Sequence, residues 1–490
     1  MIYCEEIDNY IKFVENNPNE TDDEIKLLIK NIVKPTLSRD DVFFDADKYY
    51  KCIKYCEKWY YKLFPYQKFI YAFVFMYEDK NRDVVIFPDI FILMGRGNGK
   101  DGMIMPLANF LQTHHYGVKN YHIDIVATSE EQAINSFNVV YNMLEDNRNT
   151  MKKYFYWNKT EVINKITHSI LRYNTANAKT KDGKQTGMII FNELHAYEDY
   201  KQLNVYSSGL GKIIHSRTVT ITTNGTVREG PLDEKISLSK PVLNGEVNLL
   251  GLLPIIYKIN NKKLVDEPMK KYLETGNKED INIIYWIQAN PSLRYRSTLL
   301  NEIIRDYTKM QKQKSYRVEF YAKRMNLPEQ DEEQAVTDWN NILRASYSDT
   351  DEEISRTTGD IKGRKAIIGI DYASLNDFAS AGFLFKIDGE YIWRQKTWIC
   401  SKSKFFGDIK FPFNNAGQAG FEDFVVVNTE TIDAEEIVIW LVTEMSKYNI
   451  QKWVMDMYRF LLLKSIFEKY GISMETKDNM FRTSQNDKKV

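Results

Sequence analysis

A glycine-rich loop follows an apolar run at residues 87–100, whose sequence is FPDIFILMGRGNGK. Gly95, Gly97 and Gly99 keep side chains away from the backbone, so that its N–H groups can converge on phosphate oxygens. Lys100 then brings a positive charge to the β- and γ-phosphates of a nucleotide. The order of these residues predicts a phosphate-binding loop at the end of a buried strand.

Two positions depart from the usual pattern of such loops. Met94 stands where a first glycine is common, and Asp101 stands where a serine or threonine usually follows the lysine. Taken alone, the loop is therefore also compatible with an ordinary glycine-rich turn. Arg96 is a further cation of the loop, which either contacts the γ-phosphate or only holds the loop in shape.

A second apolar run, at residues 187–191, ends in Asn192 and Glu193. A buried strand that ends in a metal-side group followed by a carboxylate is typical of the Walker B element of NTPases. Glu193 is predicted to act as the general base that polarises the water attacking the γ-phosphate. The alternative is that both residues merely end a strand at the surface.

Asp101 and Asn192 together reverse the usual magnesium environment, in which the loop supplies a hydroxyl and the second strand supplies a carboxylate. The exchange conserves the total charge. One hypothesis is that Asp101 reaches the Mg²⁺ shell, directly or through water, while Asn192 takes the neutral role. The other is that Asp101 caps the following helix, where its charge suits the N-terminal dipole.

Further strands alternate with helices in this half of the chain. Residues 121–128 have strand character, and Ser129 is a helix cap followed by acidic first-turn residues. Residues 219–225 form another strand that ends in a polar turn. The alternation predicts an α/β fold with a parallel-type sheet and a ligand at the carboxyl ends of its strands, as in RecA-like ATPases.

Two strands near the end of the chain also end in carboxylates, which are Asp371 after residues 365–370 and Asp456 after residues 451–455. If the strands are neighbours, these groups suit a divalent-metal site that activates water against a phosphodiester. Asp377 is a weaker candidate ligand, since it could simply end a turn.

The composition limits the number of domains and the kind of nucleic-acid binding that can be expected. With 490 residues, 43% of them hydrophobic, the chain can bury more than one core. The net charge of −1 argues against a uniformly basic nucleic-acid binder, but it permits local patches. The run 305–324 is either such a patch or a solvated helix face. The other candidates for DNA contact are Lys179, Lys181 and Lys184.

In order and spacing these motifs resemble those of the large terminase subunits of tailed bacteriophages, the motors that package DNA into empty heads. The matching segments are LFPYQ at 63–67, GRGNGK at 95–100, FNELHAY at 191–197, TTNG at 222–225, ANPS at 289–292, RMN at 324–326 and IGID at 368–371. The resemblance covers most of the chain. It implies an ATPase that translocates double-stranded DNA and an RNase H-like metal nuclease that cuts concatemers.

The resemblance implies roles for the matching residues. The implied nucleotide-binding residues are Gln67, which would recognise adenine, and Gly95, Arg96, Gly97, Asn98, Gly99, Lys100 and Asp101. The implied coupling motif is Thr222, Thr223, Asn224 and Gly225. The predicted catalytic residues are Glu193, Arg96, Lys100, Asp371 and Asp456, and the predicted metal contacts are Asp101, Asn192, Asp371 and Asp456. The implied cofactors are ATP with Mg²⁺ and, at the nuclease site, Mg²⁺ or Mn²⁺.

The expected domain order is a helical N-terminal segment at 1–62, a P-loop ATPase core at 63–240, a lid or linker subdomain at 241–330, an acidic connector at 331–360 and an RNase H-like domain at 361–490. The family pattern has a further acidic metal ligand well beyond the second strand carboxylate. Because this chain stops at Val490, the nuclease is expected to be incomplete and slow, unless Asp377 or Asp487 substitutes.

The resemblance also implies partners, which are double-stranded DNA, a portal protein and a small terminase subunit, with a homo-oligomeric ring on the portal. The sequence has no signal peptide and no apolar run long enough for a membrane, so the expected location is the cytoplasm of the bacterial host. Two alternative functions stay open at this point. One is a non-catalytic remnant used for docking, and the other is a helicase-like translocase without nuclease activity.

Overall fold

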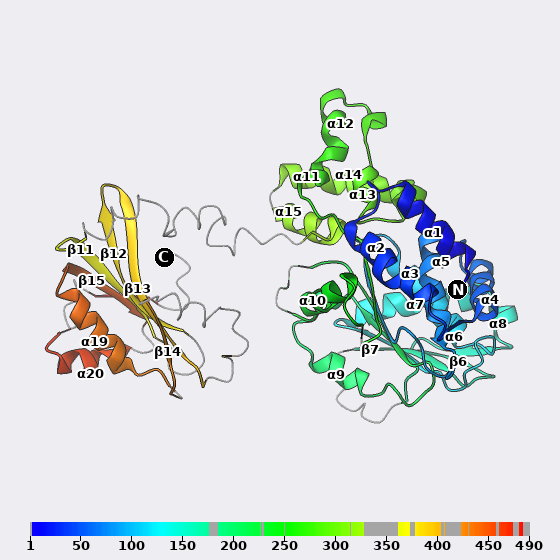
Figure 1. Cartoon of the computed structure of the whole chain (residues 1–490), viewed down its shortest axis with the longest axis horizontal. Coiled ribbons are helices and arrows are strands. Elements are labelled where there is room, and N and C mark those ends of the chain that lie inside the picture. Colours follow the sequence, from blue (N-terminus) through cyan, green and yellow to red (C-terminus); the bar gives the residue numbers. More distant parts are fainter. Residues whose placement is uncertain are drawn as a thin grey trace. The chain divides into compact units, whose positions relative to one another are not determined.

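The computed structural model describes residues 2–175, 185–225, 227, 230–248, 250–313, 315–327, 361–372, 378–402, 406, 423–429, 431–456, 460–473 and 480–483. The chain divides into two compact units, Met1–Val336 and Thr337–Val490. Each unit has a sheet and a hydrophobic core of its own (Figure 1).

The sheet of the first unit has eight strands in the order β10-β3-β9-β8-β4-β7-β6-β5. Their bounds are β3 Asp89–Leu93, β4 Ile123–Ala127, β5 Phe155–Trp157, β6 Glu161–Asn164, β7 Ile170–Thr175, β8 Met188–Asn192, β9 Arg217–Thr222 and β10 Leu252–Ile256. The strands from β10 to β7 run parallel, which confirms the predicted α/β fold. Strands β5 and β6 continue the sheet as an antiparallel edge, which the sequence analysis did not foresee.

The central strands are apolar runs because helices cover both faces of a parallel sheet. Strands β4, β8 and β10 are buried at every position. Helix α6 (Lys100–Leu111) follows β3, and α7 (Glu130–Asp146) follows β4. The predicted cap of α7 is confirmed, since the Ser129 hydroxyl accepts a hydrogen bond from the Gln132 N–H at 3.3 Å.

The N-terminal helices share the hydrophobic core of this sheet. They are α1 Glu5–Asn16, α2 Asp23–Leu28, α3 Lys34–Leu37, α4 Ala46–Trp59 and α5 Pro65–Ala72, with a π-helical turn at Ile29–Val33 and a two-stranded ribbon of β1 Val42–Phe44 and β2 Met76–Glu78. Helix α2 contacts β10 and α10 (Pro231–Leu243), and α4 contacts α6 (Figure 1). The remaining helices of this part are α8 Arg148–Met151 and α9 Lys201–Ser207.

A smaller helical layer follows β10 and has a separate core around Trp286, Tyr307 and Phe320. Its helices are α11 Lys263–Asp266, α12 Lys270–Thr275, α13 Ile284–Ile287, α14 Ser297–Lys312 and α15 Ser315–Glu319, followed by a π-helical turn at Phe320–Arg324. We call residues 257–327 the linker subdomain. Two of its segments, at 289–292 and 323–324, reach the phosphate-binding loop, as described below.

The sheet of the second unit has the order β14-β13-β12-β11-β15-β16. Its strands are β11 Lys365–Asp371, β12 Ala379–Ile387, β13 Glu390–Cys400, β14 Phe424–Val427, β15 Asn449–Asp456 and β16 Met480–Thr483, and its helices include α19 Ala434–Met445 and α20 Phe460–Lys469. Strands β11 and β15 are parallel neighbours, as the proposed metal site requires. Within the described ranges, no helix has both the length and the apolar character needed to cross a bilayer.

Candidate active site

The phosphate-binding loop joins β3 to α6. Gly97 and Gly99 have φ angles of +91° and +76°, a region that is costly for residues with a Cβ. Helix α6 begins at Lys100, so the N–H groups of its first turn have no carbonyl partner within the helix. Such N–H groups, together with the positive end of the helix dipole, are suited to bind an anion.

The linker subdomain holds the upstream half of the loop. The Gly95 N–H donates to the Ala289 carbonyl at 2.8 Å, and the Arg96 N–H donates to the Lys323 carbonyl at 2.7 Å. A Cβ on Gly95 would lie 2.3 Å from Oδ1 of Asn290. Gly95 is therefore required for close contact with the linker subdomain.

Asn98 is a buried anchor of the same loop. Its Nδ2 donates to the Gly95 carbonyl at 2.8 Å and to Oδ1 of Asn290 at 2.7 Å, and its Oδ1 accepts from the Ser292 hydroxyl at 2.8 Å. All of these partners are protein groups. Asn98 therefore fixes the loop conformation, a role that the glycine-rich pattern did not reveal.

Most cations at the end of the linker subdomain are paired. Arg324 lies 2.8 Å from Asp306 and donates to the Arg96 carbonyl at 2.7 Å. Lys323 lies 3.0 Å from Glu319, and that carboxylate is also 3.2 Å from Arg96, whose side chain is 61% exposed. The predicted contacts Lys179, Lys181 and Lys184 lie outside the described residues.

Lys100 is buried at 5% relative exposure, and its Nζ donates to the Met94 carbonyl at 3.4 Å. Burial lowers the pKa of Lys100, while the negative charges of Glu193 and Asp101 act in the opposite direction. A buried ammonium with one long hydrogen bond is poorly satisfied. It is suited to neutralise an anion that enters the loop.

Glu193 directly follows β8 and has a φ of +53°, which is unusual for a residue with a side chain. Such backbone strain often occurs at functional sites. Its Oε2 is buried and receives no aligned hydrogen bond within the described part of the chain, although it lies 3.0 Å from Nδ1 of His195. Burial opposes ionisation, but the charge of Lys100 and the contact with His195 lower the pKa of Glu193 to about 2.

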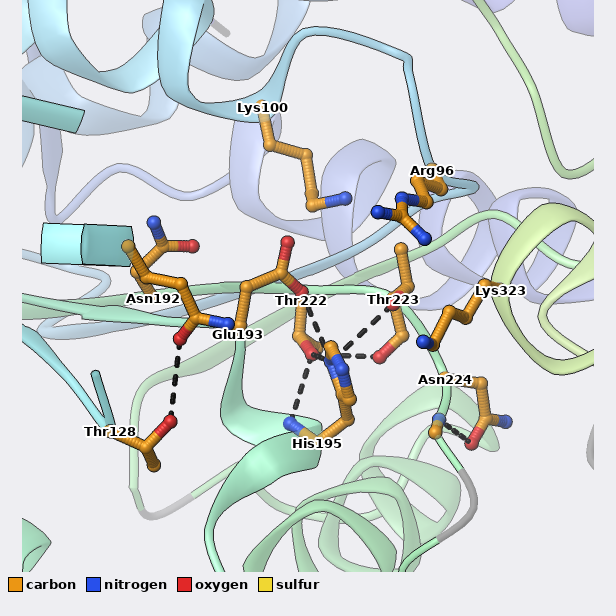
Figure 2. A network of polar contacts seen from close by, with 12 residues as sticks. Arg96, Lys100, Thr128, Asn192, Glu193, His195, Thr222, Thr223, Asn224 and Lys323 are labelled. Atoms are coloured by element: carbon orange, nitrogen blue, oxygen red, sulfur yellow. Dashed lines mark hydrogen bonds and ion pairs between the residues drawn. The ribbon is translucent and has the colours of Figure 1, made fainter. Parts of the chain in front are cut away.

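Figure 2 shows Lys100 and Arg96 directed from the loop toward the side of the sheet where Glu193, Thr222 and Thr223 lie. The carboxyl ends of β3, β8 and β9 are adjacent in the sheet, which is why these side chains meet. The structure therefore brings the loop and the end of β8 to the same edge of the sheet.

Asp101 and Asn192 are in direct contact. Nδ2 of Asn192 donates to Oδ1 of Asp101 at 2.9 Å and to the Ser136 hydroxyl at 2.7 Å, and that hydroxyl also donates to Asp101. In the described part of the chain, the hydrogen bonds of the Asp101 side chain come from Ser136 and Asn192. Sequence reasoning missed Ser136, because nothing in its local pattern distinguishes it from any polar residue of α7.

The implied coupling motif is buried between β9 and the linker subdomain. The backbone N–H of Asn224 donates to Oδ1 of Asn326 at 2.9 Å, and the side-chain Nδ2 of Asn224 also donates to the Asn326 carbonyl at 3.3 Å. Asn326 in turn donates to the Tyr257 carbonyl at 2.7 Å. The motif is thus tied to both ends of the linker subdomain.

Gln67 is 2% exposed, and its Oε1 accepts a hydrogen bond from the Phe64 N–H at 2.9 Å. The neighbouring Tyr66 hydroxyl donates to the Asn98 carbonyl of the loop at 3.2 Å. Tyr66 also lines a cavity of about 180 Å³ whose other walls include Tyr10, Phe13 and Tyr295.

The strand carboxylates of the second unit end adjacent parallel strands. Ile370 is paired with Met455, so Asp371 and Asp456 follow at the same edge of the sheet. Asp456 is also paired with Thr483 of β16. The side chain of Asp456 and all of Asp377 and Asp487 lie outside the described residues. Among side chains that are described, no three His, Cys, Asp or Glu residues form a metal cluster.

Two family models match the chain. The model of the terminase large subunit ATPase domain matches residues 65–240, and the model of the terminase large subunit endonuclease domain matches residues 273–460. Together they account for most of the chain.

The chain belongs to the large terminase subunit family.

As a large terminase subunit, it is an ATPase and an endonuclease of phage DNA packaging, which confirms the function implied by the motifs.

Several solved structures are similar to this terminase. The HK97 bacteriophage large terminase is 16% identical, with a TM-score of 0.49 over 90% of this chain and 85% of that chain. The large terminase of the thermophilic bacteriophage D6E in complex with ADP is 9% identical, with a TM-score of 0.28 over 82% and 78%. The ATPase domain of the Thermus phage P74-26 large terminase is 12% identical, with a TM-score of 0.33 over 51% and 99%. No curated protein matches the chain.

Replacing Gly95 by alanine tests the contact between loop and linker subdomain. The added methyl group would collide with Asn290, so we expect Gly95→Ala to destabilise this terminase by about 1–3 kcal/mol. Gly102→Ala is the matched control, because its Cβ would meet only Tyr61 at 3.4 Å and alanine favours a helix. Urea unfolding followed by circular dichroism measures both. Equal stability of the two variants would contradict the contact.

The lowered pKa of Glu193 predicts a pH-dependent contribution to stability. Its ordinary value is 4.5 and its folded value is about 2, so the ionised group stabilises the fold above about pH 5, and this stabilisation is lost as pH falls toward 2. The free energy of unfolding of the parent minus that of Glu193→Gln should therefore decrease from pH 6 to pH 3. A difference that is constant over this range would contradict the assignment.

Proposed function

We propose that ATP binds with its phosphates on residues 95–101 and that Glu193 polarises the attacking water. The observation that carries this proposal is the placement of two oppositely charged side chains, the buried Lys100 and the partly buried Glu193, beyond the carboxyl ends of β3 and β8, which flank β9. The buried Oε2 of Glu193 lacks an aligned donor, and a water molecule is a suitable one. Lys100 would neutralise the β- and γ-phosphates.

Arg96 is the proposed second cation for the γ-phosphate. Its guanidinium lies 3.2 Å from Glu319, and an ion pair is weak when both side chains are exposed to solvent, as these are. Phosphate, with more charge and more acceptor oxygens than a carboxylate, would compete for it effectively. The aromatic cavity of about 180 Å³ is the proposed adenine site, because its size and aromatic walls suit a planar base. Tyr66 lines this cavity, and Gln67 is proposed to support the site as the next residue in the chain.

The residues Asp101 and Asn192 fit the magnesium ion that accompanies ATP. Because an ionised carboxylate only accepts hydrogen bonds, Nδ2 of Asn192 must face Asp101, which directs Oδ1 of Asn192 away from that pair. This oxygen is buried and accepts no hydrogen bond within the described part of the chain. Carboxylate and amide oxygens suit Mg²⁺, which would neutralise phosphate charge when bound.

The second unit is proposed to cut double-stranded DNA with Mg²⁺ or Mn²⁺ held by Asp371 and Asp456. Neighbouring strand ends support this assignment. We further propose that the chain forms a ring on a portal protein, works with a small terminase subunit and acts in the host cytoplasm. Thr222, Thr223, Asn224 and Gly225 are proposed to couple hydrolysis to movement, which is supported by the hydrogen bonds of Asn224 to Asn326.

Glu193→Gln is expected to retain nucleotide binding and to lower kcat by about 100-fold or more, because the amide cannot accept the proton of water. Steady-state phosphate release and titration with a fluorescent ADP analogue measure the two quantities. Glu198→Gln, a nearby acid that is exposed, is the matched control. Parental turnover in Glu193→Gln would show that the base is misassigned.

The magnesium proposal is tested by replacing Asp101 and Asn192 with the residue types that are usual at these positions. Asp101→Ser and Asn192→Asp should each weaken Mn²⁺ binding in the presence of ADP, measured by electron paramagnetic resonance, and each should lower hydrolysis. The double variant restores the usual arrangement and should recover both properties. If the two effects simply add, the positions are not coupled through the metal.

The nuclease assignment predicts that Asp371→Ala abolishes Mn²⁺-dependent cutting of linear plasmid DNA, because one metal ligand is removed. Asp388→Ala, in the exposed turn between β12 and β13, is the control. Cutting is measured on agarose gels. Cleavage that survives Asp371→Ala would remove this residue from the site.

A further inference from the structure

His195 lies beside Glu193 because the left-handed backbone of Glu193 turns the chain from β8 into a 3-10 turn at Leu194–Ala196. Its Nδ1 is 3.0 Å from Oε2 of Glu193, 3.2 Å from Oγ1 of Thr222 and 3.4 Å from Oγ1 of Thr223 (Figure 2). One ring nitrogen thus contacts the proposed catalytic base and two residues of the proposed coupling motif.

The proton on this nitrogen can be assigned from its partners. The Thr222 hydroxyl donates its only hydrogen to the Thr223 carbonyl at 2.7 Å, and its oxygen accepts from the backbone N–H of His195 at 3.1 Å. The Glu193 carboxylate can only accept while it is ionised. Both nearest neighbours of Nδ1 are therefore acceptors, so Nδ1 carries a proton and Nε2 is the nitrogen that can lack one.

The coupling motif also packs tightly on the imidazole. A Cβ on Gly225 would lie 2.7 Å from Cβ and 2.8 Å from Cδ2 of His195. Only glycine permits this approach without displacement. Any movement of residues 222–225 must therefore move the ring, and the ring is in contact with the Glu193 carboxylate.

We propose that His195 is a positioning residue, which orients the Glu193 carboxylate through Nδ1–H and makes that orientation depend on the coupling motif. This inference rests on the proposed function, since it gives Glu193 the role of base. The ring nitrogen lies 3.0 Å from Oε2 but makes no aligned hydrogen bond to it, so Oε2 can still accept a hydrogen bond from water. Because Asn224 is hydrogen bonded to Asn326, the same ring connects the base to the linker subdomain.

The alternative is that His195 merely fills space beneath Gly225. Two substitutions separate these roles in the full-length chain. His195→Asn places an amide N–H near the position of Nδ1, whereas His195→Leu keeps a similar volume without a donor. The matched control is His114→Leu, the same change at an exposed histidine.

We expect His195→Leu to lower kcat by about 10- to 100-fold with the affinity for a fluorescent ADP analogue unchanged, since misplacing a base affects the transition state. His195→Asn should recover turnover to within about threefold of the parent, because the donor is restored. In a double-mutant cycle on kcat, His195→Leu and Thr222→Val should be non-additive, because both act through one contact.

Three results would overturn the inference. They are parental turnover in His195→Leu, equal loss in His195→Asn and His195→Leu, or a loss of kcat that is matched by a fall in melting temperature and in ADP affinity. The proposed function is judged separately by Glu193→Gln. If that variant is inactive while His195→Leu is not, only the positioning role of His195 is wrong.

Discussion

The buried Lys100 ammonium is the charge around which the proposed ATP site is organised. An ammonium removed from water needs compensation, and its hydrogen bond to the Met94 carbonyl is long at 3.4 Å. The ionised Glu193 supplies part of that compensation, and its own low pKa records the same attraction. The two groups can face one space because β3 and β8 flank β9 in a parallel sheet, so that their carboxyl ends meet.

The linker subdomain also holds the residues of this site in place. It accepts hydrogen bonds from the N–H groups of Gly95 and Arg96, and it fills the space beside Gly95 with Asn290. At the end of the neighbouring strand β9, Asn326 holds Asn224. The upstream half of the loop and the proposed coupling motif are therefore bound to the same helical layer, while the N–H groups at the start of α6 have no carbonyl partner within the helix.

The sequence predicted the parallel core, the loop and the strand carboxylates, because apolar runs ending in glycine or acidic residues are local signals. Strand β11 has the bounds that were predicted for it, Lys365–Asp371. The contacts of Ser136, Asn290 and His195 could not be predicted in this way, because each joins elements that are distant in the chain. The roles of the individual residues in catalysis remain predictions, as does the expectation that the nuclease is slow.

Steady-state ATP hydrolysis by Lys100→Ala, with and without double-stranded DNA, tests the central claim most directly. If the buried ammonium organises the site, the parent should hydrolyse ATP faster when DNA is present, and Lys100→Ala should lose hydrolysis under both conditions by about 100-fold or more. Because the variant leaves the Glu193 carboxylate without the charge that offsets its burial, its melting temperature should fall, and hydrolysis is measured at a temperature where circular dichroism shows that it is folded. Hydrolysis by Lys100→Ala at the parental rate would contradict the account.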